Sequence, residues 1–455
     1  MNMISIWETI NRCFTGNKMD TKKWDMGVFK KCSELVKQYG ITYDPESVVP
    51  SDDSLADDVF KAGFDLFLDL GFYYEPEKRQ VTFSEEEIRE TMNSRPTQAT
   101  VGAGKDAVTL FHRNIEDPRK PISGGCMWAT RSEAMAIPAI MSSAQEPLIH
   151  YLETPDYLTT LYGIKPMLQS PFNIQVWRQI NAWTLEAARR VGRPGLALYE
   201  SKAEDWYNKI HYLRPTDFWC AGGWGTFELK ATYDSLCKAA YVSGLPFSVA
   251  LKKCSGGSII GGFAGGPEGA AVSAIACSHL SSIFDGGILA NFVFHSRTKS
   301  ISGNDTMWAN NVVGQALAKN TNAMFTHGGG TGSGPGTEMC FFEIAAMCIG
   351  AVVGGISSWL GCRRYAVPIE DLGTGLECRF GAEVANAASG MKRKVANDIV
   401  KELLKKYEDK LKNPPIGKQF QDCYDPVKIK PRKSYLDLYK KAKKKLEGLG
   451  LRFES

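Results

Sequence analysis

The sequence lacks most of the short motifs that identify an enzyme at a glance. None of its twelve cysteines forms a C-x-x-C pair, which excludes a zinc ribbon or a thioredoxin-type site. It has no G-x-S-x-G nucleophile elbow and no G-K-[ST] after a glycine run, which excludes a lipase-type serine site and a Walker A loop. No His, Cys, Asp and Glu cluster has convincing metal-ligand spacing, so we expect no metal site. Any chemistry has to be inferred from the order of strands and helices.

The chain also lacks the marks of export, membrane insertion or nucleic-acid binding. No basic segment followed by a long apolar run opens the sequence, and we expect a cytoplasmic protein. The most apolar stretch, Phe341–Leu360, contains Glu343 and several glycines, which favours a packed helix followed by a strand over a membrane span. A net charge of +4 does not indicate a nucleic-acid partner. The cysteines lie singly in apolar contexts, as free buried thiols in a reducing compartment do.

Two kinds of pattern divide the chain. Residues 1–95 read as helices: Phe60–Gly71 has apolar residues at helical spacing, and Ser84 precedes three glutamates, which indicates a helix start. From about residue 96, short β-branched runs alternate with helical segments. We expect strands at Ala99–Val101, Gly195–Glu200, Phe218–Ala221, Phe247–Lys252, Ala290–His295 and Ala323–His327. We expect helices at Ile174–Val191, Phe227–Val242, Pro267–Phe284, Thr306–Ala318 and Thr337–Val353.

This alternation indicates a parallel sheet covered by helices. Its length favours an α/β fold of the (β/α)₈ TIM-barrel type, with a doubly wound sheet as the alternative. Gly381–Leu411 reads as one long helix that Asn413-Pro414-Pro415 ends, and a short amphipathic helix, Tyr435–Leu446, lies near the C-terminus. We therefore predict an N-terminal helical extension (1–95), a TIM-barrel catalytic domain (96–411) and a C-terminal helical tail (412–455) that packs on the barrel or on a neighbouring subunit.

Active sites of such barrels lie at the carboxyl ends of the strands, which turns the strand list into candidate residues. Tyr199 and Glu200 end one strand; the other interpretation is a Tyr at the edge of the core and a Glu paired with Lys202. Trp219 and Trp224 flank two glycines and could form part of a cage for a cationic ammonium, although core aromatics beside a tight turn fit equally. Lys252–Ser255 forms the end of a further predicted strand.

His295 and His327 each end a predicted strand, where an imidazole could act as a general acid or base, although a lone His is more often structural. His327–Gly336 (HGGGTGSGPG) is the most unusual segment. Its glycines could expose N–H groups beside the start of the next helix and so bind an anion; the alternative is a close-packed barrel loop. A second glycine-rich segment, Gly261–Gly266, is a weak match to a nucleotide-binding loop.

The order of motifs over nearly the whole chain resembles that of the monomethylamine methyltransferases of methanogenic archaea. The motifs are FKAGF (60–64), GKDAV (104–108), GRPG (192–195), GGFAGG (261–266), GPGTEMC (334–340), GTGLE (373–377), GAEVA (381–385), FQDCYD (420–425) and KKLEGLGLRF (444–453). The resemblance implies a (β/α)₈ barrel, a homohexamer, and methyl transfer from an amine to the Co(I) of a separate corrinoid protein, with no cofactor held tightly by this chain.

The family's hallmark is pyrrolysine a few residues after GRPG, and Tyr199 stands at that position here. Two glutamates of the family's pocket fall near Thr232 and Ser255, and its glutamine and tyrosine fall near Gly328 and Gly330. These departures suggest a lineage without pyrrolysine that rebuilt its pocket. The resemblance then implies a methylated amine as donor, possibly a quaternary or larger N-methyl compound held by Tyr199 and Trp224, with an anionic tail on the glycine loop.

Three hypotheses follow. The first is a corrinoid-dependent methyltransferase in which Tyr199, His295 and His327 carry the chemistry and Glu200, Trp224, Ser255, Gly328 and Gly330 line the substrate site. The second is a binding or assembly subunit that has lost catalysis. The third is a monomethylamine methyltransferase with Tyr199 in place of pyrrolysine, which an amber codon at position 199 of the gene would favour.

Overall fold

The architecture rests on one ring of parallel strands. The structure is a computed structural model that describes residues 4–125, 129–155, 157–167, 170–199, 218–219, 221–224, 227–243, 253–285, 287–364 and 369–454. Every pairing in its central sheet is parallel, in the order β11-β10-β8-β6-β17-β16-β15-β14-β12. The strands are β6 (Ile122–Gly125), β8 (Tyr151–Glu153), β10 (Ala197–Tyr199), β11 (Phe218–Trp219), β12 (Ala221–Trp224), β14 (Lys253–Ile260), β15 (Ile288–His295), β16 (Phe325–Thr331) and β17 (Ser358–Arg364).

The sheet closes on itself at β11 and β12. These two strands flank Cys220 and belong to one short segment of the chain. The first, β11, pairs with β10, whereas β12 pairs with β14. Because β6 also pairs with both β8 and β17, the ring is continuous and the sequence order of the strands is their order around it. The predicted (β/α)₈ barrel is therefore confirmed, and the doubly wound alternative is wrong.

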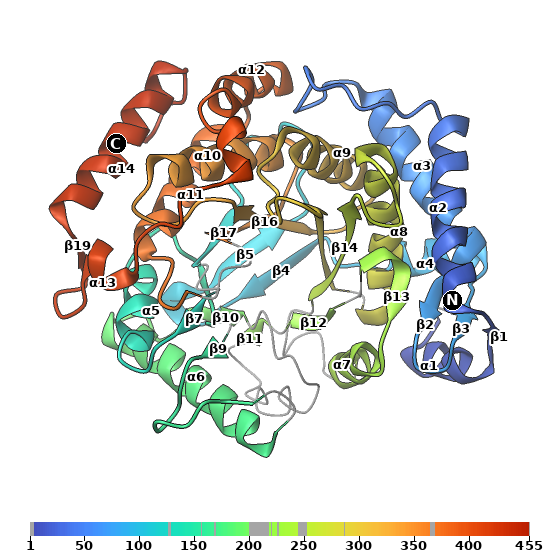
Figure 1. The fold of residues 1–455 in the computed structure, drawn as a ribbon, viewed down its shortest axis with the longest axis horizontal. Helices are drawn as coiled ribbons and strands as arrows, with labels where there is room; N and C mark the ends of the chain where they lie inside the picture. The colour runs from blue at the N-terminus through green and yellow to red at the C-terminus, as the bar shows by residue number, and fades with distance from the viewer. Residues whose placement is uncertain are drawn as a thin grey trace.

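Helices surround this ring of strands (Figure 1). The most buried is α10, whose residues from Met339 to Val353 all lie in the core, as expected for a helix that is apolar around its whole circumference. The helices around the barrel are α5 (Ala136–Ala144), α6 (Pro171–Arg190), α7 (Tyr233–Ser243), α8 (Pro267–Asp285), α9 (Asn304–Asn320), α10 (Glu338–Val353) and α11 (Gly375–Ala388).

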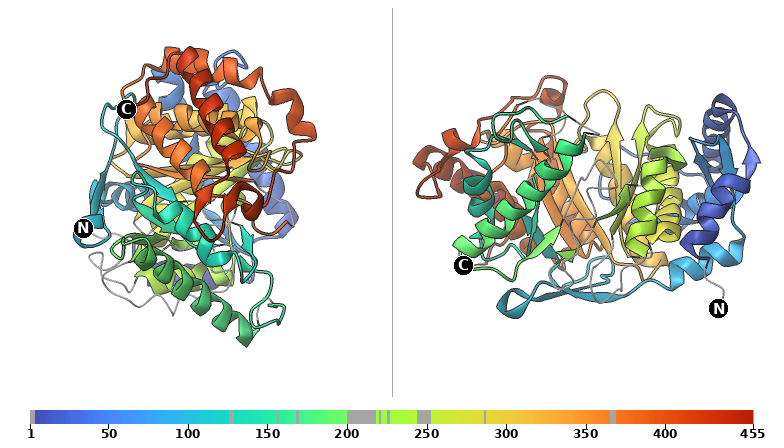
Figure 2. Two further views of the ribbon diagram at one scale, coloured as in Figure 1. Left: turned by 90° about the vertical axis from the view of Figure 1, so that its left-hand side faces the viewer. Right: turned by 90° about the horizontal axis from the view of Figure 1, so that it is seen from below.

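The N-terminal and C-terminal segments lie on opposite sides of the barrel (Figures 1 and 2). The N-terminal segment packs through α3 on α8, where a Cβ at Gly63 would overlap Ile275. As the sequence predicts, Ser84 forms a capping box with Glu87 at the start of α4. The elements are α1 (Ile6–Thr15), β1 (Asn17–Lys18), α2 (Thr21–Gln38), α3 (Asp53–Leu70), β2 (Phe72–Tyr74), β3 (Arg79–Val81) and α4 (Glu85–Asn93), with β13 (Lys230–Ala231) beside β2.

The C-terminal part corrects one prediction. The segment predicted as a single helix, Gly381–Leu411, forms the end of α11, then α12 and a 3₁₀ turn, because Gly390 has a φ of 78° and its N–H donates to the carbonyl of Asp117. The predicted helix at Tyr435–Leu446 is confirmed within α14. The elements are α12 (Arg393–Leu404), η4 (Glu408–Lys412), α13 (Phe420–Cys423), β18 (Tyr424–Asp425), β19 (Lys430–Pro431) and α14 (Lys433–Gly448).

A hairpin outside the ring covers the amino end of the barrel. The predicted strand at Ala99–Val101 is not a barrel strand: β4 (Gln98–Val101) pairs antiparallel with β5 (Val108–Phe111). The N–H of Ala103 donates to the carbonyl of Gly195, just before β10, and His112 Nδ1 lies 3.0 Å from the carbonyl oxygen of Ala323, just before β16. The hairpin thus spans the end at which the strands begin, and η1 (Gly104–Asp106) joins its two strands.

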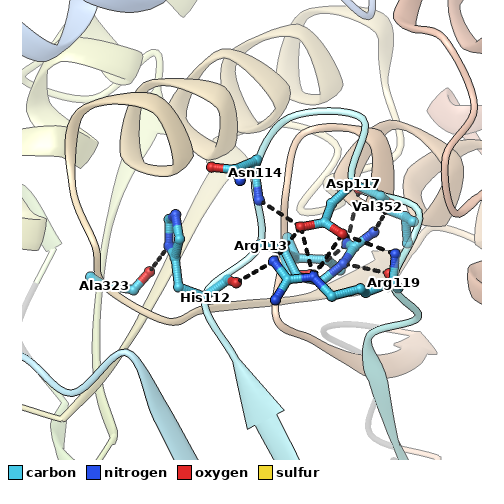
Figure 3. A network of polar contacts seen from close by, with 8 residues as sticks. His112, Arg113, Asn114, Asp117, Arg119, Ala323 and Val352 are labelled. Atoms are coloured by element: carbon cyan, nitrogen blue, oxygen red, sulfur yellow. Dashed lines mark hydrogen bonds and ion pairs between the residues drawn. The ribbon is translucent and has the colours of Figure 1, made fainter.

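Arg113 holds the next turn in place from inside the protein (Figure 3). Its buried guanidinium donates to the carbonyl oxygens of Arg119 (2.8 Å), Asp117 (2.7 Å), Val352 (3.1 Å) and Ile356 (2.7 Å). Burial lowers the pKa of Arg113 to about 10. Since these carbonyls belong to the turn before β6, to the end of α10 and to the turn before β17, Arg113 fastens the amino ends of two neighbouring barrel strands.

One predicted strand end needs correction, and two barrel strands were missed. The predicted strand Phe247–Lys252 lies outside the described residues, and β14 begins only at Lys253 and ends at Ile260. Lys252–Ser255 is therefore not the carboxyl end of a strand. Strands β6 and β8 were not predicted, because ISGG and YLE are short and lack a run of β-branched residues.

Candidate functional site

The carboxyl ends of the barrel strands form the candidate site. The β4–β5 hairpin covers the amino end, and substrate sites of (β/α)₈ barrels lie at the opposite end. The last residues of the ring strands are Gly125, Glu153, Tyr199, Trp224, Ile260, His295, Thr331 and Arg364. The contacts of residues that lie two positions earlier in these strands show which of the side chains point into the barrel.

Tyr151 marks the interior face of β8. Its hydroxyl lies 2.9 Å from Ser358 Oγ on β17, two strands away, and a Cβ at Gly124 on the intervening β6 would overlap its ring. The next residue of β6 faces the other way, since a Cβ at Gly125 would contact Ser143 of α5 on the outside. The Tyr151 ring therefore lies inside the barrel, across a strand whose missing side chain makes room for it.

Tyr199 lies on this interior face. Its side chain is 1% exposed, and its ring centroid is 6.3 Å from that of Tyr151 with an interplanar angle of 85°, an edge-to-face pair. Its Cα is in register with Glu153, and its carbonyl accepts from the N–H of Thr154 at 3.1 Å. The hydroxyphenyl group thus points into the barrel and not toward solvent. A role in binding or catalysis stays a prediction.

Glu153 is the residue that reasoning from the sequence missed. It ends β8, is fully buried and lies two residues beyond Tyr151, so that it shares the interior face. Its register partner is Tyr199. The signal was present in the sequence, because an acidic residue at the end of a short apolar run is uncommon unless it has a function. It went unused because β8 itself was not recognised.

The two predicted histidines do not meet. His295 Nε2 lies 3.5 Å from Asp305 in the first turn of α9, and its Nδ1 accepts from the N–H of Arg297. His327 is 4% exposed and stacks on Phe292 and Phe325, with Nδ1 3.2 Å from the carbonyl oxygen of Asn291. Both imidazoles therefore have partners within their own neighbourhood.

The glycine segment is mostly strand. His327, Gly328 and Gly330 belong to β16, and a Cβ at Gly328 would lie 2.7 Å from Cβ of Leu360 on β17. The register between these strands shifts between His327 and Gly329. The absence of side chains here serves the close approach of two strands, which is the packing alternative that the sequence left open.

Glu343 lies on α10, and its side chain is bonded to the loop that follows β16. Its buried carboxylate accepts from the N–H groups of Gly332 (2.6 Å) and Ser333 (3.0 Å), from the Ser333 hydroxyl and from Ser302 Oγ (2.6 Å). Burial raises its pKa. The N–H of Gly334 donates to the carbonyl of Pro415. Three N–H groups of the segment expected to receive a substrate's anionic tail, those of Gly332, Ser333 and Gly334, are thus already bonded within the chain.

The remaining predicted site residues are placed only in part. Trp224 is in register with Ser255, which is the third residue of β14. Gly330 is in register with Arg363. Glu200 lies outside the described residues. Thr232 is not in the ring: its hydroxyl accepts from the N–H of Ser235 at the start of α7.

Other absences concern only the part of the chain that the structure describes. Within these residues no three His, Cys, Asp or Glu side chains are grouped as metal ligands. Over the same residues, none of the helices has the length and apolar character needed to cross a membrane. Among the cysteines whose side chains the structure describes, none forms a disulfide, and all except Cys237 are buried. Burial raises the pKa of Cys32 to about 12, so this thiol is not a ready nucleophile.

Comparison with known proteins gives one consistent result. The family model described as "Monomethylamine methyltransferase MtmB" matches residues 4–451. Monomethylamine methyltransferase MtmB2 of Methanosarcina acetivorans is 29% identical over 465 residues, covering 98% of each chain, and MtmB3 of Methanosarcina barkeri is 28% identical with the same coverage. The crystal structure of the M. barkeri enzyme has a TM-score of 0.94 at 26% identity and covers 99% of each chain; a hydroxylamine complex of MtmB matches equally.

Proposed function

Since this chain belongs to the monomethylamine methyltransferase family, we propose that it transfers a methyl group from a small methylated amine to the cobalt of a separate corrinoid protein. The family assignment makes the chain a methyltransferase. The proposal adds the donor, the acceptor protein and the place of reaction, the carboxyl end of the barrel. The observation that carries it is the position of Tyr199, buried and inside a closed ring of parallel strands.

The chain's own contribution is to bind and orient the donor. When bound, the corrinoid would supply the nucleophile, a Co(I) that takes a methyl group as a cation. An ammonium form of the donor loses its methyl group and leaves as a neutral amine, so the barrel has to hold a cation with its methyl group turned toward the carboxyl end. Tyr199 offers an aromatic face and a hydroxyl for that purpose. A buried location excludes water and strengthens such contacts.

The family resemblance places the corrinoid on a second protein, and we propose that this protein docks over the carboxyl end of the barrel. We propose a homohexamer for the assembly, on the family resemblance alone.

The structure does not support the kind of donor that the sequence suggested. The hypothesis that an anionic tail of the donor rests on the glycine loop loses support, because the Glu343 carboxylate already accepts from the N–H groups of Gly332 and Ser333. The proposal therefore covers methylated amines in general, without preference for a quaternary compound.

Methyl transfer with purified components tests the proposal. The chain is mixed with a Co(I) corrinoid protein and, in turn, with mono-, di- and trimethylamine, tetramethylammonium and glycine betaine, and the loss of the Co(I) absorbance is followed. We expect transfer from at least one amine and a rate at least tenfold lower for Tyr199→Ala. Absence of transfer from every donor would refute the function and leave the binding-subunit hypothesis.

A further inference from the structure

We propose that Glu153 binds the ammonium group of the donor, so that the carboxylate and Tyr199 form the two sides of the cation site. This inference rests on the proposed function, because it assumes that the substrate is a methylated ammonium. It goes beyond that function in naming the charged group and in predicting which ammonium compounds the barrel accepts.

The first support is position. Glu153 is the last residue of β8 and fully buried, and Tyr199, its partner in register on β10, is the last residue of the neighbouring strand. Both share the interior face that the contacts of Tyr151 define. Two residues of strand correspond to about 7 Å, so Glu153 lies one layer nearer the carboxyl end than the Tyr151 ring.

The second support is that the charge is exceptional. Among the described ring strands, Glu153 is the one carboxylate; the other residues of β6 to β17 are apolar, neutral polar, glycine, histidine or basic. Side chains at the strand ends of the catalytic end of a (β/α)₈ barrel are the ones that bind ligands, and Glu153 is the acidic one among them.

The third support is the layer below. The Tyr151 ring, held by its hydrogen bond to Ser358 Oγ and lying over Gly124, forms a floor beneath Glu153 and Tyr199. A small cation that enters from the carboxyl end would therefore stop at the level of the carboxylate. Its methyl group could then point outward, toward the face at which the acceptor protein would dock.

The chemistry gives a selectivity. A carboxylate accepts hydrogen bonds from an ammonium N–H, and such charge-assisted bonds are stronger than the attraction to a quaternary nitrogen, which has no N–H to donate. It also repels a donor that carries its own carboxylate. In the transfer, the C–N bond breaks, the methyl group passes to the acceptor, and the nitrogen keeps the electron pair and leaves as a neutral amine.

Two variants and two measurements test the inference. Glu153→Gln removes the charge and keeps the shape, whereas Glu377→Gln makes the same change at a buried site in the first turn of α11, outside the ring of strands, where the carboxylate is bonded to Thr374 and Tyr435. We expect Glu153→Gln to raise the KM for the amine about 10- to 100-fold with less effect on kcat, as expected for the loss of a hydrogen bond to a charged group. The Glu377→Gln control should keep the wild-type KM.

Binding without the corrinoid protein provides the second measurement. Methylammonium chloride should bind to the wild type in calorimetry and bind at least tenfold more weakly to Glu153→Gln. In the wild type alone, tetramethylammonium and glycine betaine should bind more weakly than methylammonium, a comparison that holds even if the variant does not fold.

The outcomes separate the two proposals. Transfer by the wild type with an unchanged KM in folded Glu153→Gln would overturn the role of Glu153 and keep the function. A wild type that transfers from no donor, yet binds methylammonium through Glu153, would overturn the function alone. Equal binding of glycine betaine and methylammonium, or no binding of any ammonium, would overturn the inference.

Discussion

The pH dependence of stability provides a sharp test of the buried charges, and Glu377 is the best place to make it. Its carboxylate accepts from the N–H (2.7 Å) and the hydroxyl (2.6 Å) of Thr374 at the start of α11, and from the hydroxyl of Tyr435 on α14. Burial outweighs these bonds and raises the pKa of Glu377 from its ordinary 4.5 to about 7. The side chain therefore links a helix of the barrel to the C-terminal helix and titrates near neutrality.

The sign follows from the two states. In the unfolded chain Glu377 ionises near 4.5, whereas in the folded chain it keeps its proton up to about 7. Its contribution to stability is therefore fully present below the unfolded pKa and is lost as the pH rises through the folded pKa. A pKa difference of this size corresponds to about 3 kcal/mol at most. Glu377→Gln has no proton to lose, and its amide can still accept from Thr374 and donate to the oxygen of Tyr435.

Urea unfolding of the wild type and Glu377→Gln at pH 5, 6, 7 and 8 measures the effect. We expect the variant to gain stability relative to the wild type between pH 5 and 7, by about 2–3 kcal/mol. Glu146, whose pKa burial raises to about 7 as well, titrates in both proteins, so the difference between them isolates Glu377. Parallel curves for the two proteins over the whole range would show that the Glu377 carboxyl is not desolvated as described.

Other substitutions test the packing. Arg113→Met removes the guanidinium donor from four backbone carbonyls, of which those of Asp117 and Val352 keep a backbone N–H donor, and should cost at least about 3 kcal/mol in urea unfolding; a loss below 1 kcal/mol would contradict this. Gly124→Ala forces a methyl group against the Tyr151 ring and should cost about 1–3 kcal/mol, whereas Gly27→Ala, with no neighbour within 4 Å in α2, should be neutral or stabilising. Glu343→Ala leaves the buried N–H groups of Gly332 and Ser333 without their acceptor and should cost about 2–6 kcal/mol in urea unfolding. An unchanged unfolding midpoint would refute this prediction.

The fold could be predicted where local patterns and tertiary packing agree. The helices from α6 to α10 have long apolar faces and clear ends, and their predicted bounds lie within a few residues of the observed ones, apart from the start of α7. The prediction of one helix over Gly381–Leu411 was wrong because helix propensity is high on both sides of Gly390. Only the left-handed turn at that glycine separates α11 from α12.

The short barrel strands could not be predicted from local pattern. In a closed parallel ring, strands are buried on both faces and need no alternation of polar and apolar residues, so β6 reads as a turn and β14 as a glycine-rich loop. Of the candidate site, Tyr199 could be located from the sequence, because it ends a predicted strand and stands at the position that matches the pyrrolysine of the family. Glu153 could not, since its strand has three residues and its importance depends on the neighbour that register gives it.

The two buried glutamates at the carboxyl end bear on the same question, which donor the barrel accepts. Glu343 neutralises the loop after β16 from outside the ring, so this loop has no free N–H at Gly332 or Ser333 for an anion. Glu153 places negative charge inside the ring beside Tyr199. Glu343 removes an attraction for a donor's carboxylate, and Glu153 adds a repulsion. Both effects favour a donor that carries positive charge alone. If a zwitterionic donor proved to be the best substrate, the conclusion that Glu153 and Glu343 disfavour a donor with its own carboxylate would be wrong.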